Sequence, residues 1–415
     1  MIKNNLIFCG ISHLSLNYGA TAAKFKNNVI FFDFKNKIND YLNNKIVIEE
    51  PNLNKYLNKY RKKISFSSEL PYNLKSSIIF IAIDINTSKK NISSYNYINK
   101  IIKHLKNNVS DKNVPLVIMS QVNPGFTESI KWPKKYLFYQ VETLIFGKAI
   151  ERATNPERII VGTYDGNKVL NKLYLKYLNN FKALKIFMRY QEAELTKMFI
   201  NSFLVSDLIL TNLLSSFCKK LNLDWENPKK ALKLDKRIGK YAYLNPGLGI
   251  SGGNLERDIE NLNKINQKLN INSKLFNVFK DESVKQKNWI KTIISKYKKN
   301  NIINKDAKIG IIGISYKEGT NSIKNSPSII TIENLKKYKI FCYDELLFNT
   351  KIKKFDLEWK KTEEIISFCD TLFIFHSSKN LLKKLLINKK IKLLVDPYKI
   401  IDKKNNTFKF EIESL

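Results

Sequence analysis

Short apolar runs alternate with amphipathic stretches through the first third of the chain. Four runs, each four to six residues long, are typical of parallel strands buried on both faces. Before the last of them, Tyr97–Leu105 has the three- and four-residue spacing of a helix with one buried face. Strands separated by helices predict a doubly wound parallel sheet, which Leu144–Ile150 and Ile159–Gly162 are expected to extend to about residue 180. The four runs are Leu6–Cys9, Val29–Phe32, Ile78–Ile83 and Leu116–Met119.

A different pattern begins at Gln191. From there to Leu221, apolar side chains recur at helical spacing without Pro or Gly, which predicts one long helix, and Leu255–Leu269 predicts a second. The Lys- and Asn-rich stretch Gln286–Lys308 is expected to connect this helical region to a smaller α/β domain. We therefore predict three domains, at residues 1–185, 186–285 and 286–415. The strands expected in the last domain are Lys308–Ile314, Lys339–Tyr343, Thr371–Phe375 and Leu393–Asp396.

Composition excludes several classes of protein. No apolar run approaches the roughly 20 residues that span a bilayer, and the first run is too short for a signal peptide, so we expect a cytoplasmic protein with no membrane partner. Only three His are present, and no two of them are close in sequence, so no metal site is expected. The four Cys show no C-x-x-C spacing and are expected to be buried thiols in a reducing compartment. They are Cys9, Cys218, Cys342 and Cys369.

The net charge of +35, with an isoelectric point of about 9.7, raises the question of nucleic-acid binding. Lys, Asn and Ile are abundant throughout the chain, Arg is scarce, and no basic block stands apart. Proteins that read nucleic acids tend to use Arg and localised patches. A compositional bias therefore explains the charge better, and no nucleic-acid partner is expected. The charge would still favour a small anionic substrate.

A glycine turn follows the first strand. A dinucleotide site needs a strand, a G-x-G-x-x-G turn, a helix, and an acid after the second strand. Here the turn is Gly10-x-Ser12-x-x-Ser15, so Gly10 can make the tight bend, whereas Ser12 places a side chain where pyrophosphate usually meets bare backbone. A serine hydroxyl can also hydrogen-bond phosphate at a helix N-terminus. Asp33 lies at the expected distance and favours the ribose diol of NAD; the alternative is a capping Asp after a strand.

The segment Asn245–Asp258 reads NPGLGISGGNLERD. It resembles the active-site loop of the UDP-glucose/GDP-mannose dehydrogenases, P-x-x-G-x-G-G-x-C-x-x-K-D. Aligned on Asp258, the family's nucleophilic Cys falls on Asn254 and its Lys on Arg257. The resemblance implies an NAD-binding domain, a central helical domain that forms a homodimer, and a C-terminal domain that binds a nucleotide sugar. Cell-surface polysaccharide synthesis is the family's usual context.

Two further motifs carry the chemistry that the resemblance implies. Glu192–Asn201, EAELTKMFIN, is similar to the family's A-E-L-x-K-x-x-x-N helix, in which Lys197 and Asn201 share one face and grip a substrate oxygen with help from Asp258. Val141–Ala149, VETLIFGKA, resembles the P-E-x-x-x-x-G-x-A loop. There the family implies that Glu142 is the general base for thioester hydrolysis and that the loop backbone contacts the substrate.

Substrate contacts follow from the same resemblance. Arg237 matches a D-x-R-I-G motif whose Arg reaches a sugar across the dimer interface, and a guanidinium suits such bidentate contacts. Gly313–Pro327 is similar to G-x-x-[FY]-K-x-x-T-x-D-x-R-x-S-P, which implies that Lys317 contacts the sugar diphosphate, and Lys324 stands at the motif's Arg. Gly252 and Arg257 of the active-site loop are also implied to bind substrate. On the cofactor side, Gln121 replaces a Thr of the S-T-V-x-P-G turn, and Ile83–Asn86 has lost the Thr and Pro of V-x-T-P.

The loss of the Cys divides the expected chemistry. The first oxidation of a primary alcohol needs a base and a group that stabilises the alkoxide, and those residues are retained. The second step in this family passes through a thiohemiacetal, which the Asn254 amide cannot form, although it can hydrogen-bond the sugar or polarise an aldehyde. The enzyme could stop at the aldehyde, oxidise the hydrated aldehyde directly, or bind a nucleotide sugar without turnover. The sequence therefore predicts an NAD-dependent UDP-hexose dehydrogenase, with a non-catalytic nucleotide-sugar-binding homologue as the alternative.

Overall fold

The computed structural model of the 415-residue chain describes residues 5–25, 27–88, 92–167, 171–352, 355–377, 381, 385, 388, 390–401 and 410–415. The chain divides into two compact units, Met1–Ile200 and Asn201–Leu415. Each unit contains one sheet, and the boundary falls within the long helix α7, Tyr190–Lys220. The three domains predicted from the sequence stay a prediction.

The first sheet has eight strands in the order β3-β2-β1-β4-β5-β6-β7-β8. The chain places β2 and β3 on one side of β1 and the remaining strands on the other. All pairs are parallel except β6 with β7, which is antiparallel. The strand order reverses between β1 and β4, and doubly wound sheets bind ligands at the carboxyl ends of the strands at such a switch point. The strands are β1 (Asn5–Cys9), β2 (Asn28–Phe32), β3 (Ile64–Ser67), β4 (Ser77–Ile81), β5 (Leu116–Ile118), β6 (Leu137–Gln140), β7 (Arg158–Thr163) and β8 (Leu184–Arg189).

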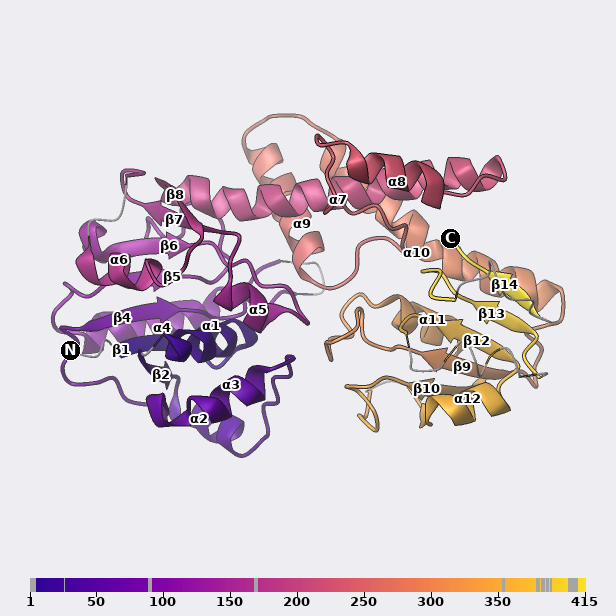
Figure 1. The fold of residues 1–415 in the computed structure, drawn as a ribbon, viewed down its shortest axis with the longest axis horizontal. Helices are drawn as coiled ribbons and strands as arrows, with labels where there is room; N and C mark the ends of the chain where they lie inside the picture. The colour runs from indigo at the N-terminus through magenta and orange to yellow at the C-terminus, as the bar shows by residue number, and fades with distance from the viewer. Residues whose placement is uncertain are drawn as a thin grey trace. The chain divides into compact units, whose positions relative to one another are not determined.

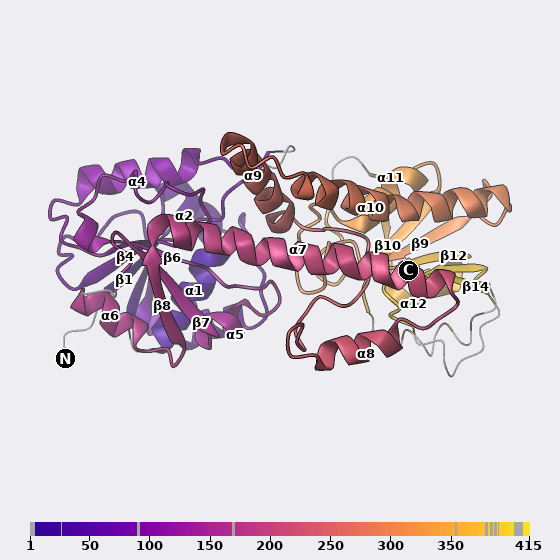
Figure 2. The same cartoon turned by 90° about the horizontal axis from the view of Figure 1, so that it is seen from above.

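Helices cover both faces of this sheet. One buried cluster joins α1, α3, α5 and α6 to one face, and another joins α4 and the first turn of α7 to the other face. Figure 2 shows α4 and α6 on opposite sides of the strands. The doubly wound fold predicted from the apolar pattern is therefore confirmed. The helices are α1 (His13–Lys24), α2 (Lys35–Leu42), α3 (Leu53–Lys59), α4 (Asn96–Asn108), α5 (Ala149–Thr154) and α6 (Lys172–Leu178), with short 3₁₀ turns at Arg61–Lys63 and Lys134–Tyr136.

The expected strand at Leu144–Ile150 is wrong. This segment is a loop that turns at Gly147, where φ is +85°, and leads into α5 at Ala149. Its apolar residues serve loop packing, because Leu144 packs against a core cluster and the Phe146 ring stacks on His13 at 4.2 Å between centroids. An apolar run of this length does not distinguish a strand from a packed loop.

The second unit contains a six-stranded parallel sheet in the order β11-β10-β9-β12-β13-β14. Helices α10 and α11 contribute to the buried cluster on one face and α12 to the cluster on the other. The strands are β9 (Lys308–Ile312), β10 (Lys339–Tyr343), β11 (Glu358–Trp359), β12 (Thr371–Ile374), β13 (Leu393–Val395) and β14 (Glu411–Glu413). The helices are α8 (Glu226–Leu234), α9 (Asn254–Lys268), α10 (Leu275–Lys299), α11 (Pro327–Leu335) and α12 (Thr362–Phe368).

The expectation of a connecting stretch at Gln286–Lys308 is wrong for most of its length. Residues up to Lys299 belong to α10, a helix of 25 residues. Its Ile290, Ile293, Ile294 and Tyr297 are buried against the second sheet, while the intervening Lys, Thr and Ser residues are exposed. The polar composition concealed a helix with one apolar face, because burying three or four residues per two turns is enough to hold it.

The long helix predicted from Gln191 onward is confirmed as α7, an unbroken helix of 31 residues (Figure 1). Among the described residues it is the one helix long and apolar enough to cross a membrane, with a mean hydropathy of 1.4 over 18 residues. Only 28% of that window is buried within the protein, and a soluble helix with an apolar contact face has the same composition.

Candidate active site

The turn after β1 has the geometry of a dinucleotide-binding turn. Gly10 has a φ of +101°, and a Cβ at this position would lie 2.5 Å from Cγ1 of Ile83, which follows β4. Only glycine fits such a close approach. Ser12 is the N-cap of α1 and forms a capping box with Ser15, in which each hydroxyl accepts a hydrogen bond from the other residue's backbone N–H at 3.1 Å. Both hydroxyls are therefore already engaged in capping α1.

The acid after β2 is fully buried. The Asp33 carboxylate accepts hydrogen bonds from the backbone N–H groups of Ile11 and Phe34, each at 2.7 Å, and from the Tyr97 hydroxyl. Its position beside the Gly10 turn fits a ribose-binding acid, and its contacts also tie β2 to the turn. The glycine bend, the start of α1 and Asp33 together fit the frame of an NAD site.

Glu142 and Lys197 form an ion pair in the first unit. The Lys197 ammonium lies 2.8 Å from the Glu142 carboxylate, and each side chain is 12% exposed. Glu142 lies in the loop after β6 and also accepts a hydrogen bond from the Leu144 N–H at 3.0 Å. Lys197 lies in the second turn of α7. The structure thus brings together two predicted catalytic residues separated by 55 positions in the chain.

Glu194 is a site residue that the sequence analysis did not single out. It lies one turn before Lys197 on α7, is fully buried, and accepts hydrogen bonds from the N–H groups of Gly125 at 2.6 Å and Thr127 at 2.9 Å. Burial raises the pKa of Glu194 to about 7, although these two donors oppose the shift. The carboxylate holds the loop after β5, which also carries the buried Gln121. Its place in the A-E-L-x-K motif was the signal that could have identified it.

In the second unit, Asn201 and Asp258 are directly bonded. The Asn201 amide donates to the Asp258 carboxylate at 2.5 Å, and Arg257 Nε donates to the other carboxylate oxygen at 3.0 Å. All three residues are buried. Because Asp258 accepts from one amide hydrogen, the orientation of the Asn201 side chain is defined. The contact supports the predicted role of Asp258 in positioning Asn201.

The loop that contains residue 254 packs against the motif after β9. Gly252 has a φ of +77°, and a Cβ there would lie 3.0 Å from the Tyr316 ring. A Cβ on Gly253 would lie 3.0 Å from the side chain of Lys324, whose pKa is lowered by burial. Asn254 follows as the exposed first residue of α9. The second unit thus joins the two motifs that the sequence placed about 60 residues apart.

Two of the remaining predicted substrate residues, Arg237 and Lys317, are exposed. Arg237 forms a bidentate pair with Asp235 at 3.0 and 2.7 Å, and its side chain is 89% exposed. Lys317 is also exposed, in the turn after β9. Arg257 does not face solvent; it is buried against Asp258, and its contact with a substrate stays a prediction.

Three of the four thiols are buried, and none lies in the loop that contains residue 254. Cys9, Cys342 and Cys369 are buried, and burial raises the pKa of each. Cys218 is partly exposed, which corrects the expectation that all four are buried, but it lies near the end of α7, whereas Asn254 begins α9. Across the described ranges, no group of three or more His, Cys, Asp or Glu side chains could hold a metal ion.

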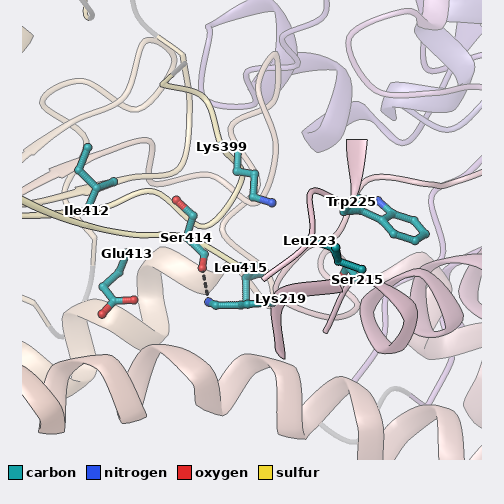
Figure 3. Close-up of a pocket in the computed structure, with 9 residues that line it drawn as sticks. All are labelled: Ser215, Lys219, Leu223, Trp225, Lys399, Ile412, Glu413, Ser414 and Leu415. Carbon is teal, nitrogen blue, oxygen red and sulfur yellow. Dashed lines mark hydrogen bonds between the residues drawn. The ribbon is translucent and has the colours of Figure 1, made fainter. Parts of the chain in front are cut away.

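A cavity of about 250 Å³ lies elsewhere in the second unit (Figure 3). Its lining includes Lys219 from α7 and Lys399 from the turn after β13, and the Lys219 ammonium donates to the Ser414 carbonyl at 2.6 Å. The described residues that line it include none of the predicted site residues. It is therefore distinct from the motifs that carry the chemistry.

Comparison with known proteins matches two regions of the chain, which contain most of the predicted site residues. The UDP-glucose/GDP-mannose dehydrogenase family, NAD binding domain, matches residues 4–178, and the central domain of that family matches residues 191–282. A UDP-glucose 6-dehydrogenase of Rickettsia bellii is 29% identical over 346 residues, which cover 80% of this chain and 78% of that protein. Another from Campylobacter jejuni is 28% identical over 362 residues, covering 84% and 88%.

Solved structures share the fold over nearly the whole chain. A UDP-D-ManNAc dehydrogenase from Pyrococcus horikoshii aligns with a TM-score of 0.79 at 17% identity, covering 99% of this chain and 98% of that one. A UDP-glucose dehydrogenase from Pyrobaculum islandicum aligns with a TM-score of 0.74 at 18% identity, covering 90% and 89%. The two matched domains together span more than half of the sequence. The chain therefore belongs to the UDP-glucose/GDP-mannose dehydrogenase family.

Proposed function

We propose that this protein uses NAD to oxidise the C6 hydroxyl of a UDP-hexose such as UDP-glucose. The family's NAD binding domain supports the cofactor, and the relatives named UDP-glucose 6-dehydrogenase support the substrate. The largely enclosed ion pair of Glu142 and Lys197 is the observation that carries the proposal. Alcohol oxidation needs a proton acceptor and a cation close to the same oxygen, and this pair supplies both.

The proposed role of each residue follows from its contacts. Lys197 and Asn201, one turn apart on α7, donate hydrogen bonds to the substrate oxygen, and Asp258 keeps the Asn201 amide in place. Glu142 accepts the hydroxyl proton or orients the substrate. NAD⁺, when bound, supplies the acceptor for the hydride that leaves C6. The residues proposed to hold the nucleotide sugar are Arg237, Gly252, Arg257 and Lys317.

We propose further that the second oxidation is slow or absent. Position 254 holds an amide, which cannot add to the aldehyde and leave again as a thiolate does. Asn254 can instead donate a hydrogen bond to the aldehyde oxygen. Any acid would then have to come from direct oxidation of the hydrated aldehyde, without a covalent intermediate. The aldehyde is therefore the expected main product.

The test is the number of NADH molecules formed per UDP-glucose consumed, with other UDP- and GDP-hexoses assayed in parallel. We expect one NADH per sugar and an aldehyde that a hydrazine reagent can trap. Asn254→Cys should raise the ratio toward two, whereas the matched control Asn254→Ser should leave it at one. Two NADH per sugar in the unaltered protein would contradict the proposal and point to the hydrated-aldehyde route.

A second candidate is a non-catalytic homologue that binds a nucleotide sugar and acts as a partner subunit of an active enzyme. The serines at positions 12 and 15, Gln121 and Asn254 favour it, because each replaces a residue of the family's working pattern. Thermal stabilisation by a UDP-sugar with none by NAD, and no NADH from any sugar, would support this candidate over the dehydrogenase.

We also propose that the protein is a cytoplasmic homodimer without a nucleic-acid or membrane partner. Exposed apolar side chains along α7, including Phe203 and Phe217, support a second copy as the occupant of that face. Another face of α7 is engaged within the second unit: Thr211 donates to the Tyr243 carbonyl at 2.9 Å, and Asn212 accepts from the Gly247 N–H at 2.8 Å. Polar contacts of this kind favour a helix packed on protein over one surrounded by lipid.

A further inference from the structure

The carboxylate of Asp33 already accepts hydrogen bonds from other groups of the protein. Its two carboxylate oxygens accept from two backbone N–H groups and from the Tyr97 hydroxyl, and its side chain has no exposed surface. In a dinucleotide site, the acid after the second strand binds the ribose hydroxyls of the cofactor. The Tyr97 hydroxyl is a donor of the same chemical kind as a ribose hydroxyl. It stands where a ribose hydroxyl would have to donate.

Tyr97 is placed on Asp33 by the start of α4. The ring is half-enclosed, with the Phe34 ring in a T-shaped contact at 6.2 Å and the Lys37 ammonium 6.0 Å from its centroid. The ring is partly buried and packs against the edge of a core cluster of the first unit. A rotation of the side chain would remove the Tyr97 hydroxyl from the Asp33 carboxylate.

Backbone N–H groups at the start of α1, where a dinucleotide site binds pyrophosphate, also donate hydrogen bonds within the protein. The first turn of α1 points backbone N–H groups toward the place where a pyrophosphate binds. Here the His13 N–H donates to the carboxylate of Asp84 at 2.9 Å, and the Ser15 N–H donates to the Ser12 hydroxyl. Asp84 lies in the segment after β4, on the opposite side of the switch point from Asp33. A carboxylate at this helix N-terminus stabilises α1 and repels a second anion.

We propose that Tyr97 and Asp84 form a two-point latch on the NAD site, in which the Tyr97 hydroxyl takes the place of a ribose hydroxyl and the Asp84 carboxylate that of a phosphate oxygen. NAD binds by displacing both side chains, so the latch lowers its affinity. The proposal rests on NAD as the cofactor of the proposed function, and it is independent of whether any sugar is turned over.

The test measures binding by calorimetry and requires no catalysis. Tyr97→Phe should tighten NAD⁺ binding by about tenfold, because it removes a hydrogen bond to a charged acceptor that the ribose must replace. Asp84→Asn should tighten binding of NAD⁺ and ADP-ribose about threefold or more, because it removes a charge that competes with the pyrophosphate. Adenosine carries no phosphate, so its binding should respond to Tyr97→Phe and not to Asp84→Asn.

Matched controls exclude general effects of losing a hydroxyl or a charge. Tyr41→Phe removes a hydroxyl from α2, where the ring packs on Phe66, and Asp111→Asn removes a charge from an exposed loop. Both should leave the dissociation constants unchanged. Unchanged or weaker NAD⁺ binding in Tyr97→Phe and Asp84→Asn, or no binding in any variant, would overturn the latch. Tighter binding with no sugar oxidation would uphold the latch and reject the dehydrogenase.

Discussion

At the scale of single residues, the predicted chemistry depends on groups that are buried or largely enclosed and that have a partner. Glu142 and Lys197 stabilise each other's charge at 2.8 Å, and the Asn201 amide is held by a fully buried carboxylate. A buried charge is tolerated only when it is paired, so each of these side chains has a defined position before substrate arrives. Such preorganisation is what an alkoxide-stabilising site requires.

Lys197→Met tests this arrangement. The substitution keeps much of the side-chain volume and removes the cation, so kcat with UDP-glucose should fall about 100- to 1000-fold while KM changes much less. Steady-state kinetics would measure both. The control, Lys285→Met, removes an exposed lysine whose pair with Glu282 is 3.4 Å long, and it should leave kcat unchanged. A kcat within threefold of the unaltered protein would exclude Lys197 from the chemical step.

At the scale of elements, α7 connects a proposed catalytic residue, Lys197, to the loop after β5. Glu194 makes that connection through two backbone N–H groups, and Lys197 follows one turn later on the same helix. The sequence predicted the helix and its polar face, because both depend on local spacing. It did not predict that Glu194 reaches residues 125 and 127, because that contact depends on how the helix docks on the sheet.

Glu194 should make stability depend on pH in a known direction. Burial raises the pKa of Glu194 to about 7 from an ordinary value of 4.5, so the folded protein binds this proton more tightly than the unfolded chain does. Rising pH between those two values therefore removes stability, by about 3 kcal/mol at most. Urea unfolding at pH 5 and pH 7.5 should show this loss, and Glu194→Gln should abolish it. The control Glu282→Gln, at a partly exposed position, should still lose stability between these pH values. An equal change in unfolding free energy in the unaltered protein and both variants would contradict the raised pKa of Glu194.

At the scale of the whole molecule, the apolar surface of α7 is the feature that a lone chain does not explain. Phe203 is 75% exposed in the middle of the helix, and several neighbouring apolar side chains are about half exposed. Exposed apolar patches of this kind mark surfaces that bind another protein or a membrane. The family resemblance and the polar contacts on another face of α7 favour a second copy of the chain.

Phe203→Glu should convert the proposed dimer to a monomer, because it places a charge in the middle of the apolar face. Light scattering during gel filtration would measure the mass without detergent. Tyr72→Glu, on the exposed loop between β3 and β4, is the matched control and should remain dimeric. A monomeric unaltered protein that floats with lipid vesicles would instead favour the membrane as the partner of α7.

The sequence by itself determined the alternation of parallel strands and helices, the long helix α7, the family, and the absence of a thiol at residue 254. These follow from spacing and residue type, which are local properties. It also allowed errors at Leu144–Ile150 and Gln286–Lys308, where local composition resembled a strand and a connection.

Only the tertiary structure decided which groups of the predicted cofactor site form hydrogen bonds with other parts of the chain. The Tyr97 hydroxyl reaches Asp33 across 64 residues, and the His13 N–H reaches Asp84 across 71. A motif specifies that a donor or acceptor is present, whereas its partner is chosen by folding, because hydrogen bonds form between whichever groups the sheet brings within about 3 Å. The residues of the proposed site were therefore predictable from the sequence, whereas the hydrogen bonds that they form with other side chains of the protein were not.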